Sequence, residues 1–172
     1  MRTVELAVAL AILGAAACGG AGSPSRGRPG DEEGLTGIPA GATTVPVQTL
    51  LESTQSGLVE PQRTVVRTSE AWQSVWSRAT ANRVPAPPAP EVDFGTHMVV
   101  VVSLGRRSSG GYSVSVESAS RRGDGLYVTV EEVAPEAGCF TTQALTAPVA
   151  AARVPRAAEV EFVERHTTRA CS

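Results

Sequence analysis

The chain contains no lysine, only two histidines and three cysteines, and few aromatic side chains among its 172 residues. The lack of lysine excludes Schiff-base chemistry on a lysine side chain. His97 and His166 have no closely spaced cysteine or second histidine, so we interpret both as surface residues and expect no metal and no cofactor. A formal net charge of −2 creates no strong basic field, which argues against nucleic acid as a partner.

Motifs of nucleophilic and phosphate-transfer chemistry are also missing. The sequence has no Gly-x-Ser-x-Gly elbow, and Gly110-Gly111 leads into an expected strand instead of a helix. Glu131 and Glu132 are adjacent in another expected strand, so their side chains point to opposite faces and do not form a catalytic pair by themselves. We therefore expect no catalytic residues and no enzymatic activity. A hydrolase with an unrecognised site remains an alternative.

No apolar run is long enough to span a membrane. The longest candidate, Leu6 to Ala17, is shorter than the roughly 20 residues that a spanning helix needs. Such a run, ending in small residues, is typical of a secretory signal peptide, which we place at residues 1–17. Cys18 follows directly and resembles the cysteine of a bacterial lipobox, which implies cleavage before Cys18 and a lipid on its sulfur. An ordinary cleaved signal or a misplaced start codon are the alternatives.

The segment after Cys18 has almost no apolar side chains. Residues 19–34 consist largely of glycine, serine, proline and charged residues, which cannot bury apolar surface. We interpret residues 18–43 as a lipidated flexible tether and residues 44–172 as one domain. Gly19 provides no inner-membrane retention signal of the Asp type. We therefore expect an extracytoplasmic lipoprotein, anchored in the outer membrane if the envelope has two membranes.

The domain has the pattern of many short strands and a single helix. Its β-branched run Met98–Leu104 is typical of a central strand buried on both faces, and Arg121–Gly125 has the composition of a hairpin turn. Strands are expected at residues 45–51, 63–68, 98–104, 112–117, 126–133, 139–145, 149–154 and 159–164. We predict an α+β or mainly β fold, either an antiparallel sheet or a small barrel of short strands with one packed helix.

The single expected helix runs from Ser69, a suitable capping residue, to about Ala81. Trp72 and Trp76 recur with other apolar residues at helical spacing, so we expect them to seal the helix onto a sheet. A ligand platform built from the two tryptophans is the alternative. Four prolines in Val84–Pro90 predict an extended surface loop.

Two cysteines remain after Cys18 is assigned to lipidation. Beyond the cytoplasmic membrane a lone pair of thiols tends to oxidise. We therefore predict a disulfide between Cys139 and Cys171, which would tie the C-terminal tail to the turn at Gly138.

The run Gly105-Arg106-Arg107-Ser108-Ser109-Gly110-Gly111-Tyr112-Ser113-Val114 resembles the signature of the PrcB-like family of exported bacterial proteins. Other family features follow in order: the tryptophan helix, Val92-Asp93-Phe94, the apolar strand before the loop, and Thr142–Pro148 downstream. The resemblance covers roughly residues 63–162. It implies an accessory or binding role without a reaction, because the namesake of the family is a lipoprotein partner of a surface protease complex.

The loop from Arg106 to Tyr112 is our predicted partner-binding loop. Gly110 and Gly111 permit a close backbone approach. The loop also offers two arginines for carboxylates or carbonyls and two small hydroxyls. Its residues are Arg106, Arg107, Ser108, Ser109, Gly110, Gly111 and Tyr112. The alternative is that the glycines only turn a hairpin and that Tyr112 packs inward.

These observations favour a noncatalytic protein-interaction module, held at the membrane by its lipid. Its partner is an unknown protein, for which the family resemblance suggests an extracytoplasmic protease. The first alternative function is a protease inhibitor that acts through Gly110-Gly111-Tyr112, a loop similar to that of chagasin-type inhibitors.

Overall fold

The computed structural model describes residues 37–171, which form two four-stranded sheets and one α-helix. The elements are β1 (Thr43–Val45), β2 (Gln48–Ser53), β3 (Pro61–Val66), α1 (Ser69–Ala79), β4 (His97–Leu104), β5 (Ser113–Arg122), β6 (Gly125–Pro135), β7 (Val149–Pro155) and β8 (Glu159–Arg169). None of the helical structure in these residues is long and apolar enough to cross a bilayer. The predicted signal peptide, Cys18 and most of the predicted tether lie outside the described residues.

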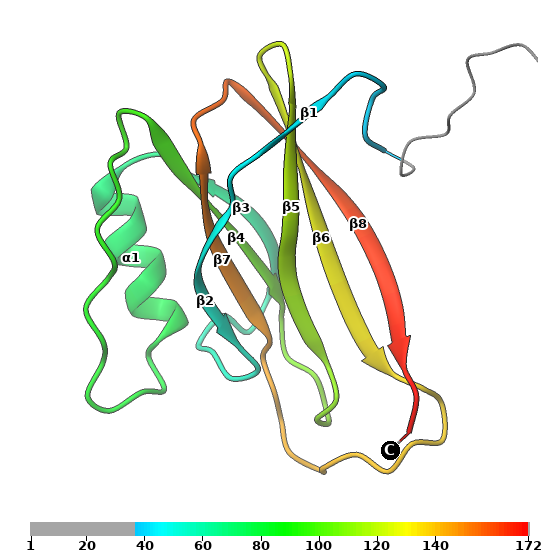
Figure 1. Ribbon diagram of the computed structural model, residues 1–172. Helices are drawn as coiled ribbons and strands as arrows, with labels where there is room; N and C mark the ends of the chain where they lie inside the picture. The colour runs from blue at the N-terminus through cyan, green and yellow to red at the C-terminus, as the bar shows by residue number, and fades with distance from the viewer. Residues whose placement is uncertain (1–36, 172) are drawn as a thin grey trace, which may run out of the picture. The chain divides into compact units, whose positions relative to one another are not determined.

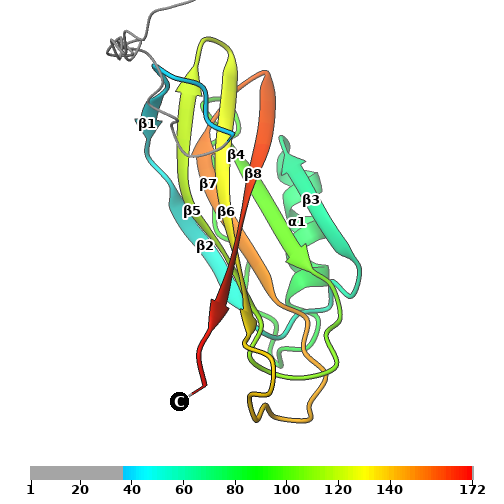
Figure 2. The ribbon, with the colours of Figure 1, turned by 90° about the vertical axis from the view of Figure 1, so that its right-hand side faces the viewer.

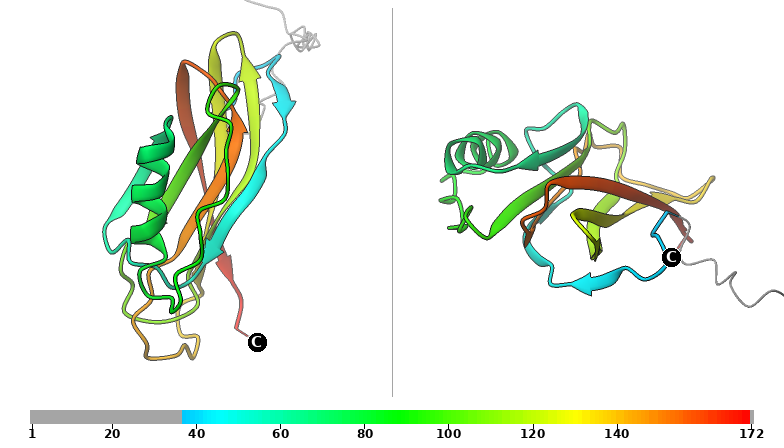
Figure 3. Two further views of the ribbon diagram at one scale, coloured as in Figure 1. Left: turned by 90° about the vertical axis from the view of Figure 1, so that its left-hand side faces the viewer. Right: turned by 90° about the horizontal axis from the view of Figure 1, so that it is seen from above.

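The eight strands form two open sheets in three layers with the helix. One sheet has the order β1-β5-β6-β8 and the other β2-β7-β4-β3. All neighbouring strands are antiparallel except β6 and β8, which run parallel. The sheets face each other, and α1 covers the outer face of the second sheet (Figures 1 and 3). The mainly β prediction with one packed helix is confirmed. The barrel alternative is wrong, because neither sheet closes on itself.

Strand β4 separates two apolar cores. Its residues Met98, Val100 and Val102 face the opposite sheet and pack with β5, β6 and β7. Val99 and Val101 point the other way and pack against α1. All five side chains are fully buried, as the continuous β-branched run predicted. The alternation of side chains along a strand allows this one segment to contribute to both cores.

Helix α1 begins at Ser69 as expected, but its N-cap is Thr68, whose hydroxyl accepts a hydrogen bond from the Ala71 amide at 3.3 Å. The helix ends at Ala79. Trp72 and Trp76 are buried in the second core, with ring centroids 5.2 Å apart. Their role in sealing the helix onto the sheet is confirmed.

Several strand boundaries differ from the prediction. The expected strand 45–51 is two edge strands, β1 and β2, because the chain crosses from one sheet to the other after Val45, at Pro46, which has no amide hydrogen to donate. The expected strand 139–145 is a loop instead, in which the Cys139 amide donates to the Glu136 carbonyl of the same loop and the Thr142 carbonyl accepts from Gly110 of another loop. Strands β5, β6 and β8 have 10, 11 and 11 residues, so they are longer than the short strands expected.

Candidate functional site

The predicted binding loop connects β4 to β5 at the lower end of the sheets in Figure 1. Its backbone is paired with the long connection between β6 and β7. Arg107 and Thr146 exchange two amide-to-carbonyl hydrogen bonds of 2.8 and 3.0 Å, and the Gly110 amide donates to the Thr142 carbonyl at 2.9 Å. The two loops therefore form one hydrogen-bonded unit.

The connection between β2 and β3 joins the same unit. The Arg106 amide donates to the Val59 carbonyl at 2.9 Å, and the Ala147 amide donates to the Thr54 carbonyl at 3.0 Å. We call residues 54–60, 105–112 and 136–148 together the three-loop end. Because each loop bonds to at least one other, their relative positions are set by backbone geometry and not by side chains alone.

The seven predicted binding residues divide into exposed and packed groups. Arg106, Ser108 and Gly111 are exposed, whereas Gly110 is buried. Tyr112 packs against the core between the two sheets, and the Arg107 guanidinium lies 5.6 Å from the centre of its ring. The structure thus brings the seven residues together on one loop but presents only some of them to a partner. Their binding role stays a prediction.

The structure requires glycine at positions 110 and 111 for two different reasons. Gly111 has a φ of +90°, a conformation that residues with a side chain rarely adopt. At Gly110 an added Cβ would collide with the Thr142 hydroxyl oxygen. This close approach is what permits the two loops to pair.

The predicted disulfide between Cys139 and Cys171 is present, with Cα atoms 5.2 Å apart and a sequence separation of 32. It ties the segment after β8 to the loop between β6 and β7. The Glu136 carboxylate lies beside the two sulfurs, and the three residues are the only metal-type cluster in the described part of the chain. Because the sulfurs are bonded to each other, neither is available as a thiolate ligand.

The three-loop end also carries exposed apolar residues that the sequence reasoning missed. Phe140 is fully exposed, and Leu145 is 62% exposed. Beside Phe140 lies a groove of about 310 Å³ that Gly111, Pro135 and the disulfide also line. The prediction of a strand over residues 139–145 concealed these residues, because a strand is expected to bury such side chains on one face.

A cluster of charged side chains joins the edges of the two sheets. Arg63 on β3 forms ion pairs with Glu132 on β6 and with Glu164 on β8, the latter through Nε at 2.7 Å. His166 Nδ1 lies 3.6 Å from the second oxygen of Glu132. Burial alone would lower the pKa of the Arg63 guanidinium, but hydrogen bonds and charges from Glu164 and Glu132 outweigh it and raise that pKa.

This cluster was also missed from the sequence. Its members are far apart in the chain and alternate with other charged residues, so no local pattern connects them. Glu131 accepts a hydrogen bond from Thr167 and stays apart from the Arg63 cluster, which agrees with the opposite orientation expected for Glu131 and Glu132. The two carboxylates that do meet, Glu132 and Glu164, share one guanidinium.

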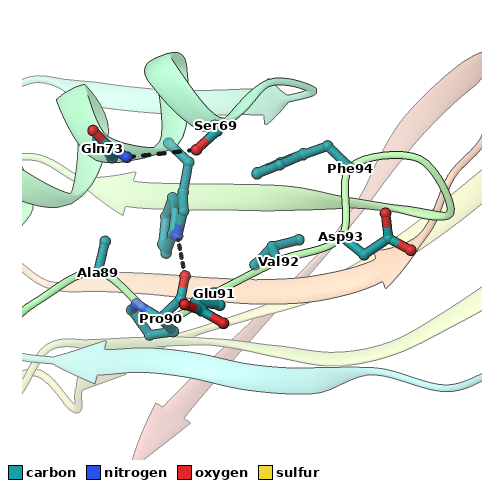
Figure 4. A pocket seen from close by; sticks show the side chains of 9 residues that line it. Ser69, Gln73, Ala89, Pro90, Glu91, Val92, Asp93 and Phe94 are labelled. Atoms are coloured by element: carbon teal, nitrogen blue, oxygen red, sulfur yellow. Dashed lines mark hydrogen bonds between the residues drawn. The ribbon is translucent and has the colours of Figure 1, made fainter.

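A larger hollow of about 530 Å³ lies on the helix side, away from the predicted loop (Figure 4). Its centre is the Trp72 ring, whose indole nitrogen donates to the Pro90 carbonyl at 2.9 Å. Trp76 donates in the same way to Pro87 at 2.8 Å. The proline-rich loop thus uses both indole N–H groups, and the burial of both rings leaves little surface for the alternative role of a ligand platform.

Comparison with known proteins bears on the same region. The family model described as PrcB C-terminal matches residues 98–155. This region is PrcB-like. The match runs from β4 to β7 and includes two of the three loops, which confirms the resemblance based on the Gly-Gly-Tyr signature, over a shorter range than the expected 63–162. Neither a curated protein nor a solved structure matches the chain.

Proposed function

We propose that this PrcB-like protein is a noncatalytic interaction module outside the cytoplasmic membrane, and that it is an accessory subunit of an envelope protease complex. The observation that carries the proposal is the three-loop end, where backbone hydrogen bonds hold three connections together. Loops that a rigid sheet framework positions are common binding sites. The family match spans two of these loops and supports an accessory role.

The proposed tether would join the domain at β1, away from the three loops. Strand β1 pairs with β5 next to the β5–β6 hairpin, at the end opposite to the three loops (Figures 1 and 2). With a lipid on Cys18, residues 19–36 can span at most about 60 Å before Gly37. Such a flexible tether would leave the domain free to turn and to reach a partner at some distance from the membrane.

Two features of the charged cluster support a noncatalytic role. Glycoside chemistry needs two carboxylates that act independently as acid and base or nucleophile. Glu132 and Glu164 instead both pair with the single guanidinium of Arg63, which also donates to the Ser103 carbonyl at 3.1 Å. This bonding pattern fits a structural link between sheets.

The geometry gives less support to the inhibitor alternative. An inhibitory Gly-Gly-Tyr loop would have to insert these three residues into a protease cleft. Gly110 is buried against Thr142, and Tyr112 packs against the core, so only Gly111 is exposed. A helper role is therefore the better proposal.

The proposal is tested by capture with the full-length, C-terminally tagged protein from detergent-solubilised envelopes. We expect one extracytoplasmic protease to copurify and to remain active in the complex. A captured protease that is inactive, and that regains activity on release, would support the inhibitor instead. If the washed wild-type protein brings down no specific partner, the interaction role itself is wrong.

The anchor is tested separately by mass spectrometry of the mature N-terminus. We expect an acyl-modified Cys18 and recovery of the protein with membranes. Cys18→Ala should move the protein out of the lipid-anchored pool without changing the melting temperature of the domain. An unmodified N-terminus beyond Cys18 in the wild-type protein contradicts lipidation.

A further inference from the structure

Exposed apolar side chains gather at the three-loop end. In the described part of the chain four large apolar residues are exposed, and three of them lie there: Val59 at 39%, Phe140 at 107% and Leu145 at 62%. Single exposed apolar residues are ordinary on a protein surface. Three exposed apolar residues on loops that are hydrogen-bonded to one another, at one end of the domain, are typical of an interaction site. The fourth, Val84, belongs to the loop between α1 and β4.

The loop that carries Phe140 and Leu145 is held at several points. The disulfide fixes Cys139, directly before Phe140. The backbone pair with Arg107 fixes Thr146, directly after Leu145, and the side-chain amide of Gln55 donates to the Leu145 carbonyl at 3.2 Å. Ordering a loop on binding lowers affinity. Here much of that ordering is already present before a partner arrives.

Polar and charged groups surround the apolar residues. Arg106 is exposed, and its guanidinium has no hydrogen-bond or ion-pair partner among the described residues. Within the three loops the charges balance, because Arg106 and Arg107 stand against Glu60 and Glu136. A surface complementary to the exposed Arg106 carries a carboxylate at the rim of an apolar hollow.

We propose that Phe140 and Leu145 form the apolar anchor with which the three-loop end docks onto a folded protein, while Arg106 pairs with a carboxylate at the rim of the contact. An aromatic anchor at the centre and charges around it are the usual arrangement of energetic hot spots. The groove beside Phe140 accepts an apolar side chain of the partner in return. The inference rests on the proposed interaction role and names the residues that carry it.

A folded protein fits this end better than a lipid surface. The charges of the three loops balance, so this end has no basic patch that would draw it to an anionic bilayer. A second copy of the chain is an outcome that the crosslinking experiment distinguishes, because it would give a covalent dimer.

The first experiment places the photoreactive amino acid p-benzoylphenylalanine at position 140 or, as the matched control, at position 84. Both positions are almost fully exposed, but Val84 lies outside the three loops. After irradiation of intact cells we expect one dominant protein adduct from position 140 and none from position 84. A covalent dimer of this chain, a lipid adduct, or the same adduct from both positions overturns the proposal, as does no adduct.

The second experiment measures the affinity of the purified full-length protein for the partner identified by that adduct. We expect Phe140→Ala with Leu145→Ala to weaken binding by roughly 30-fold or more, since removal of a central anchor has the largest effect in an interface. Arg106→Ala should lower the association rate and its salt dependence. Arg122→Ala, an exposed arginine at the opposite hairpin, and Val84→Ala should bind like the wild type.

The outcomes separate the two proposals. Phe140 is fully exposed, so its truncation leaves the melting temperature unchanged and weaker binding reports the contact itself. If wild type and Phe140→Ala, Leu145→Ala bind the partner equally, the anchor is wrong and the interaction role stands. If the wild type captures no partner at all, the interaction role fails first.

Discussion

At Gly111 two constraints meet in one residue. Its φ of +90° excludes most side chains, and an added Cβ would lie 3.1 Å from the Pro135 Cβ and 3.4 Å from the Thr141 methyl group. The first constraint concerns the backbone of the residue itself, and the second concerns its packing against the neighbouring loop. Gly123 in the β5–β6 hairpin has only the first, because its φ is +57° and no atom lies within 4 Å of its missing Cβ.

This difference makes Gly123 a control for Gly111. We expect Gly123→Ala to destabilise the domain by about 1 kcal/mol, the usual effect of a side chain at positive φ. Gly111→Ala should destabilise it by about 2–3 kcal/mol, because Pro135 must also move. Chemical denaturation of both variants measures the difference. Equal losses would show that the loops yield without strain and that only the backbone conformation matters.

At the scale of elements, β3 and β8 are joined by side chains and not by backbone hydrogen bonds. These two strands are the edges of different sheets, and no backbone ladder joins them. Arg63 bridges the gap with hydrogen bonds to both oxygens of Glu164, at 2.7 and 3.0 Å, and with its contact to Glu132. A bidentate arginine–carboxylate pair fixes orientation as well as charge. The cluster therefore holds the two sheets in register at this side.

Substitutions of Arg63 distinguish the contribution of its charge to stability from the contribution of its packing. We expect Arg63→Met, which keeps an apolar stem, to destabilise the domain by about 1–3 kcal/mol, since two neighbouring carboxylates lose their common partner in a half-buried site. The double variant Arg63→Met, Glu164→Gln should recover part of this loss because it removes the repulsion. Urea unfolding tests both. A single variant as stable as the wild type would mean that the bridge contributes nothing net.

On the scale of the whole domain, the disulfide connects the chain's last described segment to the three-loop end. Cys171 follows β8, an edge strand of 11 residues, and its bond to Cys139 holds that strand's exit beside the loop after β6. Parallel pairing of β6 and β8 brings the two exits together, because both strands run in the same direction. The sheet order thus makes the bridge possible, and the bridge in turn restrains the loop that carries Phe140.

Replacement of both cysteines by serine tests this restraint. The closed loop spans 32 residues, so the chain-entropy model predicts a loss of about 3–4 kcal/mol, or roughly 10 °C in melting temperature. Chemical reduction of the wild type should give the same decrease. Amides that exchange by global unfolding should exchange faster throughout the domain, with an additional local increase in residues 136–148 and the tail. A melting temperature within 1 or 2 °C of the wild type would show that hydrogen bonds alone hold the loop.

Sequence patterns predicted the site only to the level of a segment. The Gly-Gly-Tyr signature identified the family and singled out the loop between β4 and β5 as a candidate, and the two remaining cysteines predicted the disulfide that is present. Which side chains of the loop face outward depends on its pairing with Thr142 and Thr146. Those partners are more than thirty residues away, and no periodicity in either loop indicates that they meet.

Secondary-structure elements that depend on residues close together in the sequence could be predicted from the sequence alone. The tryptophan stripe of α1, the doubly buried β4 and the β5–β6 hairpin each depend on a local period or a turn that a few adjacent residues encode. Tertiary structure decided the change of sheet at Pro46, the parallel pairing of β6 with β8 and the exposure of Phe140. Each of these is a choice between partners distant in sequence, and its free energy comes from contacts that form only when the whole domain is assembled.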